Sequence, residues 1–423
     1  MKKIILASIA LILTTIITSA QQQPIHCGSN EYLAKMKAAD PTLQARMDSI
    51  ENVTEIWIAN HPRNEMKYRI TIPVVVHVVY DINTPSQNIP DAQIQSQIDV
   101  LNEDYNRRNA DTTNTPSYFQ PYAASVPFDF CLASRDPNGN WTNGIVRTPT
   151  TNPCIGESAI KYPSQGGDTA WDPNSYLNIW VGCIGSGILG IGTYPSGALN
   201  YEDGVVTTWN AFGRGTGYPD TLLAHYNRGR TTTHEVGHWL NLHHPWGDGN
   251  GGCCTCSDYV YDTPYQQDPT FGCPSGAHIS CNNGPDGDMY QVYMDYTDDA
   301  CMNMFSFGQT SRMMATLNGV RQQFLNSKGC LINGIDDMPN VKTISIIPNP
   351  ANDNLTLEIN LMKADNVTYS LVNVLGSVVY TSNIGNTAGG KFNINTSNLP
   401  AGIYSLQLNT TKQTINRKVV IIH

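Results

Sequence analysis

Two histidines and a glutamate in THEVGHWLNLHHPWGDGN (residues 233–250) have the spacing of a metal site. His234 and His238 are four residues apart, so on a helix their side chains share one face, with Cβ atoms roughly 5–6 Å apart. Two imidazoles at this separation can bind one zinc ion, and Glu235 beside them can take a proton from a water on that ion. The HExxH pattern therefore predicts a hydrolytic zinc site, although it also occurs by chance.

A third histidine can reach the same ion only if the helix ends and the chain turns back. His244 lies six residues after His238, and the turn falls at Asn241, where glycine would be favoured. Asparagine is the next most tolerant of a positive φ, so the turn remains feasible. His243 is one residue off this spacing and is assigned no ligand role. The expected zinc ligands are His234, His238 and His244.

The histidine segment and a downstream methionine resemble a known family. HExxHxxNxxH is similar to the metzincin metallopeptidase motif, with Asn in place of the usual Gly. Together with the cysteine-rich insert, DYVYDTP (258–264) and MDYTDDACMNMF (294–305), it resembles the pappalysin family of metzincins over about residues 25–330. The resemblance implies a metalloendopeptidase, a hydrolase that acts on proteins or peptides.

The resemblance also implies individual roles. Glu235 would be the general base toward the water and then the general acid toward the leaving amine. Met294 would pack beneath the zinc ligands without binding the metal. The Tyr296 hydroxyl would donate a hydrogen bond to the oxyanion, or Tyr296 would simply be a core residue. Asp299 would lie in the pocket for the side chain after the scissile bond and favour Arg, then Lys. Alternatively, Asp298 and Asp299 cap a turn or face solvent.

The acidic, cysteine-rich segment that follows the histidine motif needs a bound metal ion or disulfides to stay ordered. Residues 231–311 carry nine Asp, one Glu and no Lys or Arg. Oxygen ligands suit Ca²⁺, and the resemblance implies calcium ligands at Asp258 and Thr263, against the alternative of solvated turn residues. It also implies a disulfide between Cys273 and Cys301, and one from Cys281 to Cys253, Cys254 or Cys256. The sequence leaves open the pairing of Cys131, Cys154, Cys183 and Cys330.

The N-terminal residues and the net charge indicate where the protein acts and which partners it can bind. Residues 1–20 combine lysines, an apolar run and small residues at the cut, as in a secretory signal peptide. No later segment is apolar enough to be a transmembrane segment. The net charge of −10 favours cations or basic substrates, and nucleic acid is not an expected partner.

Eleven cysteines in an exported chain leave at least one unpaired. Cys27 stands alone in HCGSNEY, and its Cys-Gly pair resembles the cysteine switch of metzincin zymogens. Its thiolate would take the fourth zinc position, with residues 21–66 as the propeptide. The alternatives are a lipid-attachment or stray cysteine, and an aspartate such as Asp40 in the same inhibitory role.

Hydrophobic periodicity predicts the elements that position these residues. Strands are expected at 68–81, 126–133, 176–184 and 203–209. One helix, capped by Asp91, would bury Ile94, Ile98, Leu101 and Tyr105, and a last helix would bury Met313, Leu317, Val320 and Phe324. A propeptide helix would bury Leu43, Met47, Ile50 and Val53. The expected class is α+β (α/β): a metzincin-type catalytic domain over 67–330, with a mixed twisted sheet and an active-site helix.

After a linker at 331–343, residues 344–423 predict a separate small all-β sandwich of six short strands. The landmarks PNP, LG and AGIY resemble the C-terminal sorting domain of type IX secretion cargo. This resemblance implies type IX secretion machinery as a partner, and a protein secreted through the outer membrane or attached to the cell surface. A carbohydrate-binding or adhesive sandwich is the alternative.

The sequence thus predicts a secreted zinc endopeptidase made as a zymogen. A catalytically weak surface adhesin on a metzincin fold is the alternative, but Glu235 and three intact histidines argue against it. A zinc deamidase or esterase would use the same chemistry. The fit of a metzincin cleft to extended peptides favours proteolysis.

Overall fold

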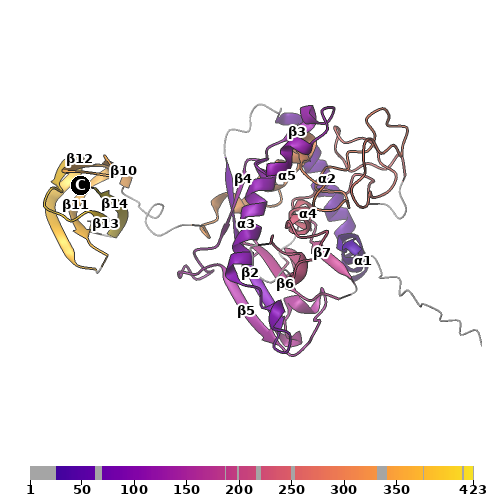
Figure 1. The fold of residues 1–423 in the computed structure, drawn as a ribbon, viewed down its shortest axis with the longest axis horizontal. Helices are drawn as coiled ribbons and strands as arrows, with labels where there is room; N and C mark the ends of the chain where they lie inside the picture. The colour runs from indigo at the N-terminus through magenta and orange to yellow at the C-terminus, as the bar shows by residue number, and fades with distance from the viewer. Residues whose placement is uncertain are drawn as a thin grey trace, which may run out of the picture.

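The computed structural model forms two bodies (Figure 1). It describes residues 25–61, 69–185, 187–197, 200–215, 221–248, 253–330, 341–374, 376–411 and 414–422. The predicted signal peptide and residues 331–340 of the predicted linker lie outside these ranges, and the predicted domain boundaries stay predictions. Within the described chain, no helix has both the length and the apolar character that crossing a bilayer requires.

The first body is built on a seven-stranded mixed sheet with the order β1-β7-β8-β6-β2-β4, and β5 pairs with β2. Only the β7–β8 pair is antiparallel. The long strand β2 (Ile70–Asp81) is almost wholly buried, as a β-branched strand covered on both faces should be. The other strands are β1 (Ile25–Cys27), β4 (Phe128–Leu132), β5 (Ile145–Thr150), β6 (Leu177–Gly182), β7 (Ile188–Gly192) and β8 (Val205–Thr208). The mixed α/β class is confirmed.

Helices α3 (Asp91–Tyr105), α4 (Arg230–Trp239) and α5 (Phe307–Asn318) pack around this sheet. The predicted inward face of α3 is confirmed, but its N-cap is Pro90, and Asp91 instead pairs with Arg147. The last helix ends at Asn318, because Gly319 follows it, so Val320 is only half-buried. Short 3₁₀ turns lie at Pro85–Gln87, Ala110–Asn114, Gln120–Tyr122, Ala159–Lys161, Pro163–Gln165, Trp209–Ala211 and Gln322–Asn326, and a two-stranded pair joins β3 (Ala123–Ala124) to β9 (Phe305–Ser306).

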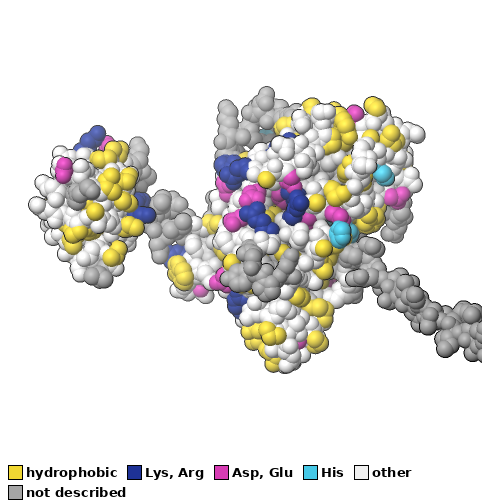
Figure 2. All heavy atoms as spheres, viewed as in Figure 1, with side chains coloured by type: hydrophobic (Ala, Val, Ile, Leu, Met, Phe, Trp, Pro, Cys, Tyr) yellow, Lys and Arg dark blue, Asp and Glu magenta, His cyan; other side chains and the backbone are white. Residues whose placement is uncertain are grey.

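The N-terminal segment contributes β1, α1 (Ser29–Ala39) and α2 (Leu43–Asn60) to the same body. Leu43 is buried as predicted, but Val53 is 51% exposed, because Thr54 faces inward beside it. Figure 2 shows basic and acidic side chains grouped together on the face that α3 lines. Pairs such as Arg214–Glu103 (2.6 Å) account for this grouping.

The insert from Cys253 to Met304 contains no helix or strand and is held by disulfides. They join Cys253 to Cys256, Cys254 to Cys281, and Cys273 to Cys301. Two more join Cys131 of strand β4 to Cys330, and Cys154 to Cys183, which directly follows strand β6. Cys27 is the one free cysteine of the described chain, and it is buried.

The second body is all-β, as predicted. Strands β10 (Val341–Ile347), β11 (Asn354–Val372), β12 (Val378–Asn395), β13 (Gly402–Asn409) and β14 (Thr414–Ile421) form one five-stranded sheet. Four predicted short strands are merged into β11 and β12, because the antiparallel ladder continues across register shifts. The hydrophobic core of the second body is separate from that of the first body. The core of the first body contains no residue after Phe324.

We predict that a chain ending at Leu331 folds and hydrolyses peptides, because neither core contains residues of the other. Its circular dichroism spectrum and melting temperature should match those of the first body in the full chain. Loss of solubility or of metal binding would show that the β-domain belongs to the catalytic fold.

Candidate active site

Helix α4 lies directly against strand β7, and glycines permit this approach. A Cβ at Gly190 would lie 2.5 Å from Cγ of Glu235, and one at Gly192 would lie 2.2 Å from the carbonyl oxygen of Glu235. Side chains at either position would push the helix away from the sheet. On its other side, the helix offers Gly237, where a Cβ would be 2.4 Å from the sulfur of Met294. The fully buried Met294 therefore packs beneath the helix, as the Met-turn prediction expects.

The chain reverses after α4 at Asn241, whose φ is +69°, so the predicted left-handed turn is confirmed. The backbone N–H of Leu242 donates to Gly237 O at 2.9 Å, which closes the helix end. The Asn241 carbonyl accepts from the guanidinium of Arg312, and its side chain donates to Glu51 of α2. These contacts hold the turn that directs His244 back toward the helix.

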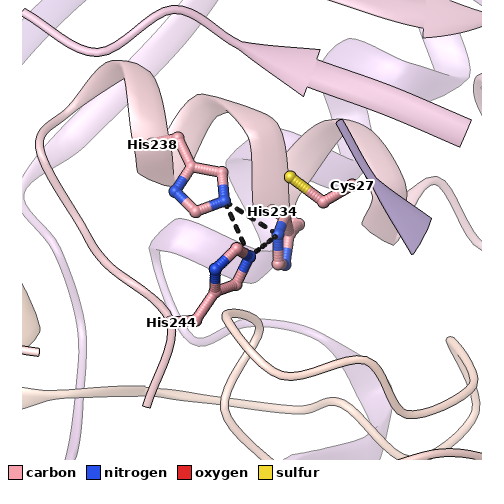
Figure 3. Close-up of side chains that lie close together, drawn as sticks. All are labelled: Cys27, His234, His238 and His244. Carbon is pink, nitrogen blue, oxygen red and sulfur yellow. Dashed lines mark hydrogen bonds between the residues drawn. The ribbon is translucent and has the colours of Figure 1, made fainter. Parts of the chain in front are cut away.

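Three imidazole nitrogens converge at one buried point (Figure 3). The Nε2–Nε2 distances are 3.0 Å for His234–His238, 3.1 Å for His238–His244 and 3.2 Å for His234–His244. The Nδ1 atoms point away from this centre. Nδ1 of His234 faces Tyr293 O at 2.7 Å, and Nδ1 of His238 faces Leu242 O at 2.8 Å. Nδ1 of His244 faces Asp248 Oδ1 at 2.6 Å. Cys27 Sγ completes a group whose ligand atoms all lie within 4.8 Å of one another.

This geometry fits a metal ion. Because each Nδ1 faces an acceptor, each ring carries its proton there and turns a lone pair on Nε2 toward the other two. Burial, followed by the neighbouring imidazoles, lowers the pKa of His234 and of His238 well below its usual range, which keeps these rings neutral. Three lone pairs so close repel unless a cation lies between them. Tetrahedral zinc with bonds of about 2.0–2.1 Å would hold its nitrogens roughly 3.3 Å apart, close to the observed spacing.

Glu235 is fully buried beside the three histidines. Burial raises the pKa of its carboxyl to about 8. Its Oε2 accepts from Ser29 Oγ at 2.9 Å and from Cys27 Sγ at 3.4 Å, and its Oε1 has no partner within the described chain. The carboxyl therefore retains one oxygen that can receive a proton. Ser29, which also accepts from the Gly192 N–H at 2.8 Å, is a contact that sequence reasoning missed.

Cys27 reaches the site as part of an added strand. β1 pairs in parallel with β7, with Cys27 opposite Gly190, and the Gly28 N–H donates to Gly190 O at 2.9 Å. Burial, followed by the charge of Glu235, raises the pKa of the Cys27 thiol well above its usual range. A cation at Sγ would reverse this effect and hold the thiolate.

Tyr296 and Asp299 line a small pocket together with His26 and His234. The Tyr296 ring is 5.0 Å from that of His244 and stacks on His26 at 5.0 Å. Asp299 lines the same small pocket as His26, Tyr226 and Tyr296, and its Oδ2 accepts the backbone N–H of Arg228 at 2.7 Å. Burial raises its pKa to about 6.

The neighbourhood of Asp299 differs from expectation in one respect. The absence of Lys and Arg from 231–311 suggested no local counter-charge, but Arg230 immediately precedes this range and its guanidinium donates to the Asp299 carbonyl. That guanidinium is paired with Asp111 at 2.7 Å, and its charge opposes, without outweighing, the rise in the pKa of Asp299 that burial causes. Asp298 pairs with His225 at 2.7 Å rather than lining the pocket.

The two candidate calcium ligands are in contact with each other. Asp258 Oδ2 accepts from Thr263 Oγ1 at 2.7 Å, and its Oδ1 accepts the Val260 N–H at 3.0 Å. Nearby, Asp262 accepts the Gly308 N–H at 2.9 Å and caps α5. These hydrogen bonds stabilise the turn that contains Asp258 and Thr263, and calcium binding there stays a prediction.

Known proteins are similar to this chain in sequence and in fold. The family model described as pregnancy-associated plasma protein-A matches residues 162–318. An extracellular metalloprotease of Arthroderma benhamiae is 33% identical over 253 residues, covering 60% of this chain and 79% of the relative. The chain belongs to the pappalysin family of metallopeptidases. A second such relative, from Arthroderma otae, is 35% identical over 245 residues, covering 58% of the pappalysin chain and 76% of its own length.

Solved structures agree with this assignment. Mature mirolysin of Tannerella forsythia, in complex with a cleaved peptide, is 46% identical, with a TM-score of 0.58, and the match covers 61% of this pappalysin and 96% of mirolysin. A promirolysin mutant is 41% identical, with a TM-score of 0.64 and coverage of 71% and 97%. The model for a secretion system C-terminal sorting domain matches residues 345–422. This pappalysin is therefore a metalloendopeptidase that is secreted or attached to the cell surface.

Proposed function

We propose that this pappalysin is a zinc endopeptidase, exported as a latent precursor, that cleaves polypeptides before Arg or Lys. The observation that supports it most is the convergence of three inward imidazole nitrogens and the Cys27 sulfur (Figure 3). The Glu235 carboxyl lies beside them, 3.4 Å from the Cys27 sulfur. The purified protein should contain about one zinc per chain and digest casein. A chelator should abolish digestion, and added zinc should restore it. Digestion that persists without metal would refute the proposal.

His234, His238 and His244 would hold the ion. Bound zinc supplies a Lewis acid that polarises the scissile carbonyl and lowers the pKa of water to about 7. Glu235 accepts a proton from the attacking water and then gives it to the leaving amine. Burial raises the pKa of this carboxyl, which favours its taking up a proton. The Tyr296 hydroxyl donates to the oxyanion, and Met294 supports the ligands from below.

Strand β7 would align the substrate. Once β1 has left, the backbone groups of Ile188 and Gly190 that pair with it are free to bind an extended peptide. A polypeptide in this position would run past the zinc ligands, with the side chain after the cut toward the pocket of Asp299.

The preference for Arg can be tested by removing one charge. Asp299→Asn keeps an oxygen for the Arg228 N–H but has no carboxylate, so selectivity for Arg over apolar residues after the cut should fall about 10–100-fold. A peptide-library digest measures it. Asp298→Asn is the matched control and should retain the preference, because Asp298 pairs with His225. An apolar preference in the wild type would refute the specificity and leave the zinc assignment intact.

Two further parts of the proposal concern ions and export. Calcium would bind at Asp258 and Thr263 once its ligands exchange their internal hydrogen bonds for the ion. Calcium analysis of the purified protein, beside that of a Thr263→Val variant, tests this site.

The sorting domain would bring the precursor to the type IX secretion machinery, and deleting it should leave the protein inside the cell.

A further inference from the structure

Asp248 connects the two adjacent histidines that end the active-site segment. Its Oδ1 accepts from His244 Nδ1 at 2.6 Å, and its Oδ2 pairs with His243 Nδ1. The Tyr194 hydroxyl donates to the same Oδ2 at 3.1 Å, and the Tyr194 ring stacks on His243 with centroids 5.2 Å apart. The Asp248 side chain is only 16% exposed. Both of its oxygens are therefore committed within one compact cluster.

His244 differs from the other two ligand histidines in how it is oriented. His234 and His238 lie on α4, and their Nδ1 atoms bond to backbone carbonyls. His244 lies on irregular chain after the turn, where no helix restricts its backbone. Of the three acceptors, only that of His244 is a side chain. The ligand with the least support from secondary structure thus has the strongest acceptor, a carboxylate.

A carboxylate on Nδ1 acts on the metal through the ring. It holds the proton on Nδ1, aims the Nε2 lone pair at the ion and raises the basicity of the ligand. For this to work, the carboxylate must itself be fixed. His243 and Tyr194 both hold Oδ2, and Asn30 of α1 donates to Oδ1 at 3.1 Å. His243 is in turn 3.6 Å from Glu51 of α2.

We infer that Asp248 is a positioning residue for the zinc ligand His244, and that His243 serves to hold Asp248. The inference rests on the proposed zinc function. It gives the fourth imidazole of the segment a role without making it a ligand. It also explains why a residue outside the HExxHxxNxxH motif is buried against it.

Zinc affinity of the full-length chain tests the inference. The background carries Glu235→Gln, which prevents self-cleavage, and Cys27→Ser, which removes the sulfur ligand. Competition with a chromogenic chelator should show a Kd about 10–100-fold higher in Asp248→Leu. Asp248→Asn keeps an oxygen for the Nδ1–H and should recover most of the affinity. The cobalt-loaded protein should show an altered visible spectrum in Asp248→Leu only.

Asp203→Asn is the matched control. Asp203 is also buried and accepts from Trp239 Nε1 of α4 at 3.0 Å, but touches no zinc ligand. The Asp203→Asn substitution should lower the melting temperature, while the Kd for zinc stays within about twofold of that of the background protein. Unchanged affinity in Asp248→Leu, or equal losses in Asp248→Leu and Asp203→Asn, would overturn the inference. Failure of the background protein itself to bind zinc would instead overturn the proposed function.

Discussion

Glu235→Gln is expected to lower peptide hydrolysis by at least about 10²–10⁴-fold while zinc stays bound. Glutamine has nearly the same shape and can keep the contact with Ser29 Oγ, now 2.9 Å from Oε2, but it cannot accept a proton from water. The three ligand nitrogens are untouched by the change. Initial rates on a fluorogenic peptide and zinc content per chain measure the two effects separately.

The control for this variant is Glu103→Gln on α3, where a partly exposed glutamate pairs with Arg214 at 2.6 Å. It should keep full activity. His244→Ala should behave differently from both, because it removes a ligand and lowers zinc content itself. Full hydrolysis by Glu235→Gln would mean that another group takes the proton, and the assigned mechanism would be wrong.

Cys27→Ser is expected to convert the precursor from latent to active or self-processing soon after folding. Serine keeps the size of the side chain but is a poor zinc ligand at neutral pH, so water can reach the fourth position. The rest of the segment would remain attached, because Glu51 pairs with Arg312 at 2.9 Å and Tyr32 bonds to Glu202 at 2.5 Å. Without the sulfur–zinc bond, β1 can leave β7 while α1 and α2 stay attached, so activity should rise before residues 29–61 are lost.

A time course of precursor size and peptide hydrolysis distinguishes these events. In the double variant with Glu235→Gln, the precursor should persist, which shows that the processing is by its own active site. Equal latency in wild type and Cys27→Ser would point to another inhibitory ligand, such as Asp40. That aspartate is bonded to Arg46 at 2.8 Å and to Thr42, so it is already engaged elsewhere.

The residues predicted best were those placed by local geometry. His234 and His238 follow from helix periodicity, and Asn241 has a positive φ because the chain must reverse within a few residues. Met294 and Tyr296 were placed near the ligands only through the family resemblance. The structure places both beside the ligand helix and its histidines.

Contacts between distant segments could not be predicted from one sequence. Ser29 is 206 positions from the Glu235 it bonds to, and no pattern in either segment indicates the other. The strand β7 was missed because ILGIG does not alternate polar and apolar residues. Its glycines were the available signal, since glycine in a strand often marks a close approach of other backbone. In the structure the neighbours of Gly190 are the side-chain atoms of Glu235, which the glycine itself does not identify.

The parallel pairing of β1 with β7 has a consequence for the life of the precursor. Without β1, strand β7 is paired only with β8 and forms an edge of the sheet. Such an edge can join to the same edge of another copy, which is a common start of aggregation. If β1 keeps the precursor latent, as proposed, the same strand would also protect the protein from self-association. Export as a precursor would then delay exposure of that edge until the copies are diluted outside the cell.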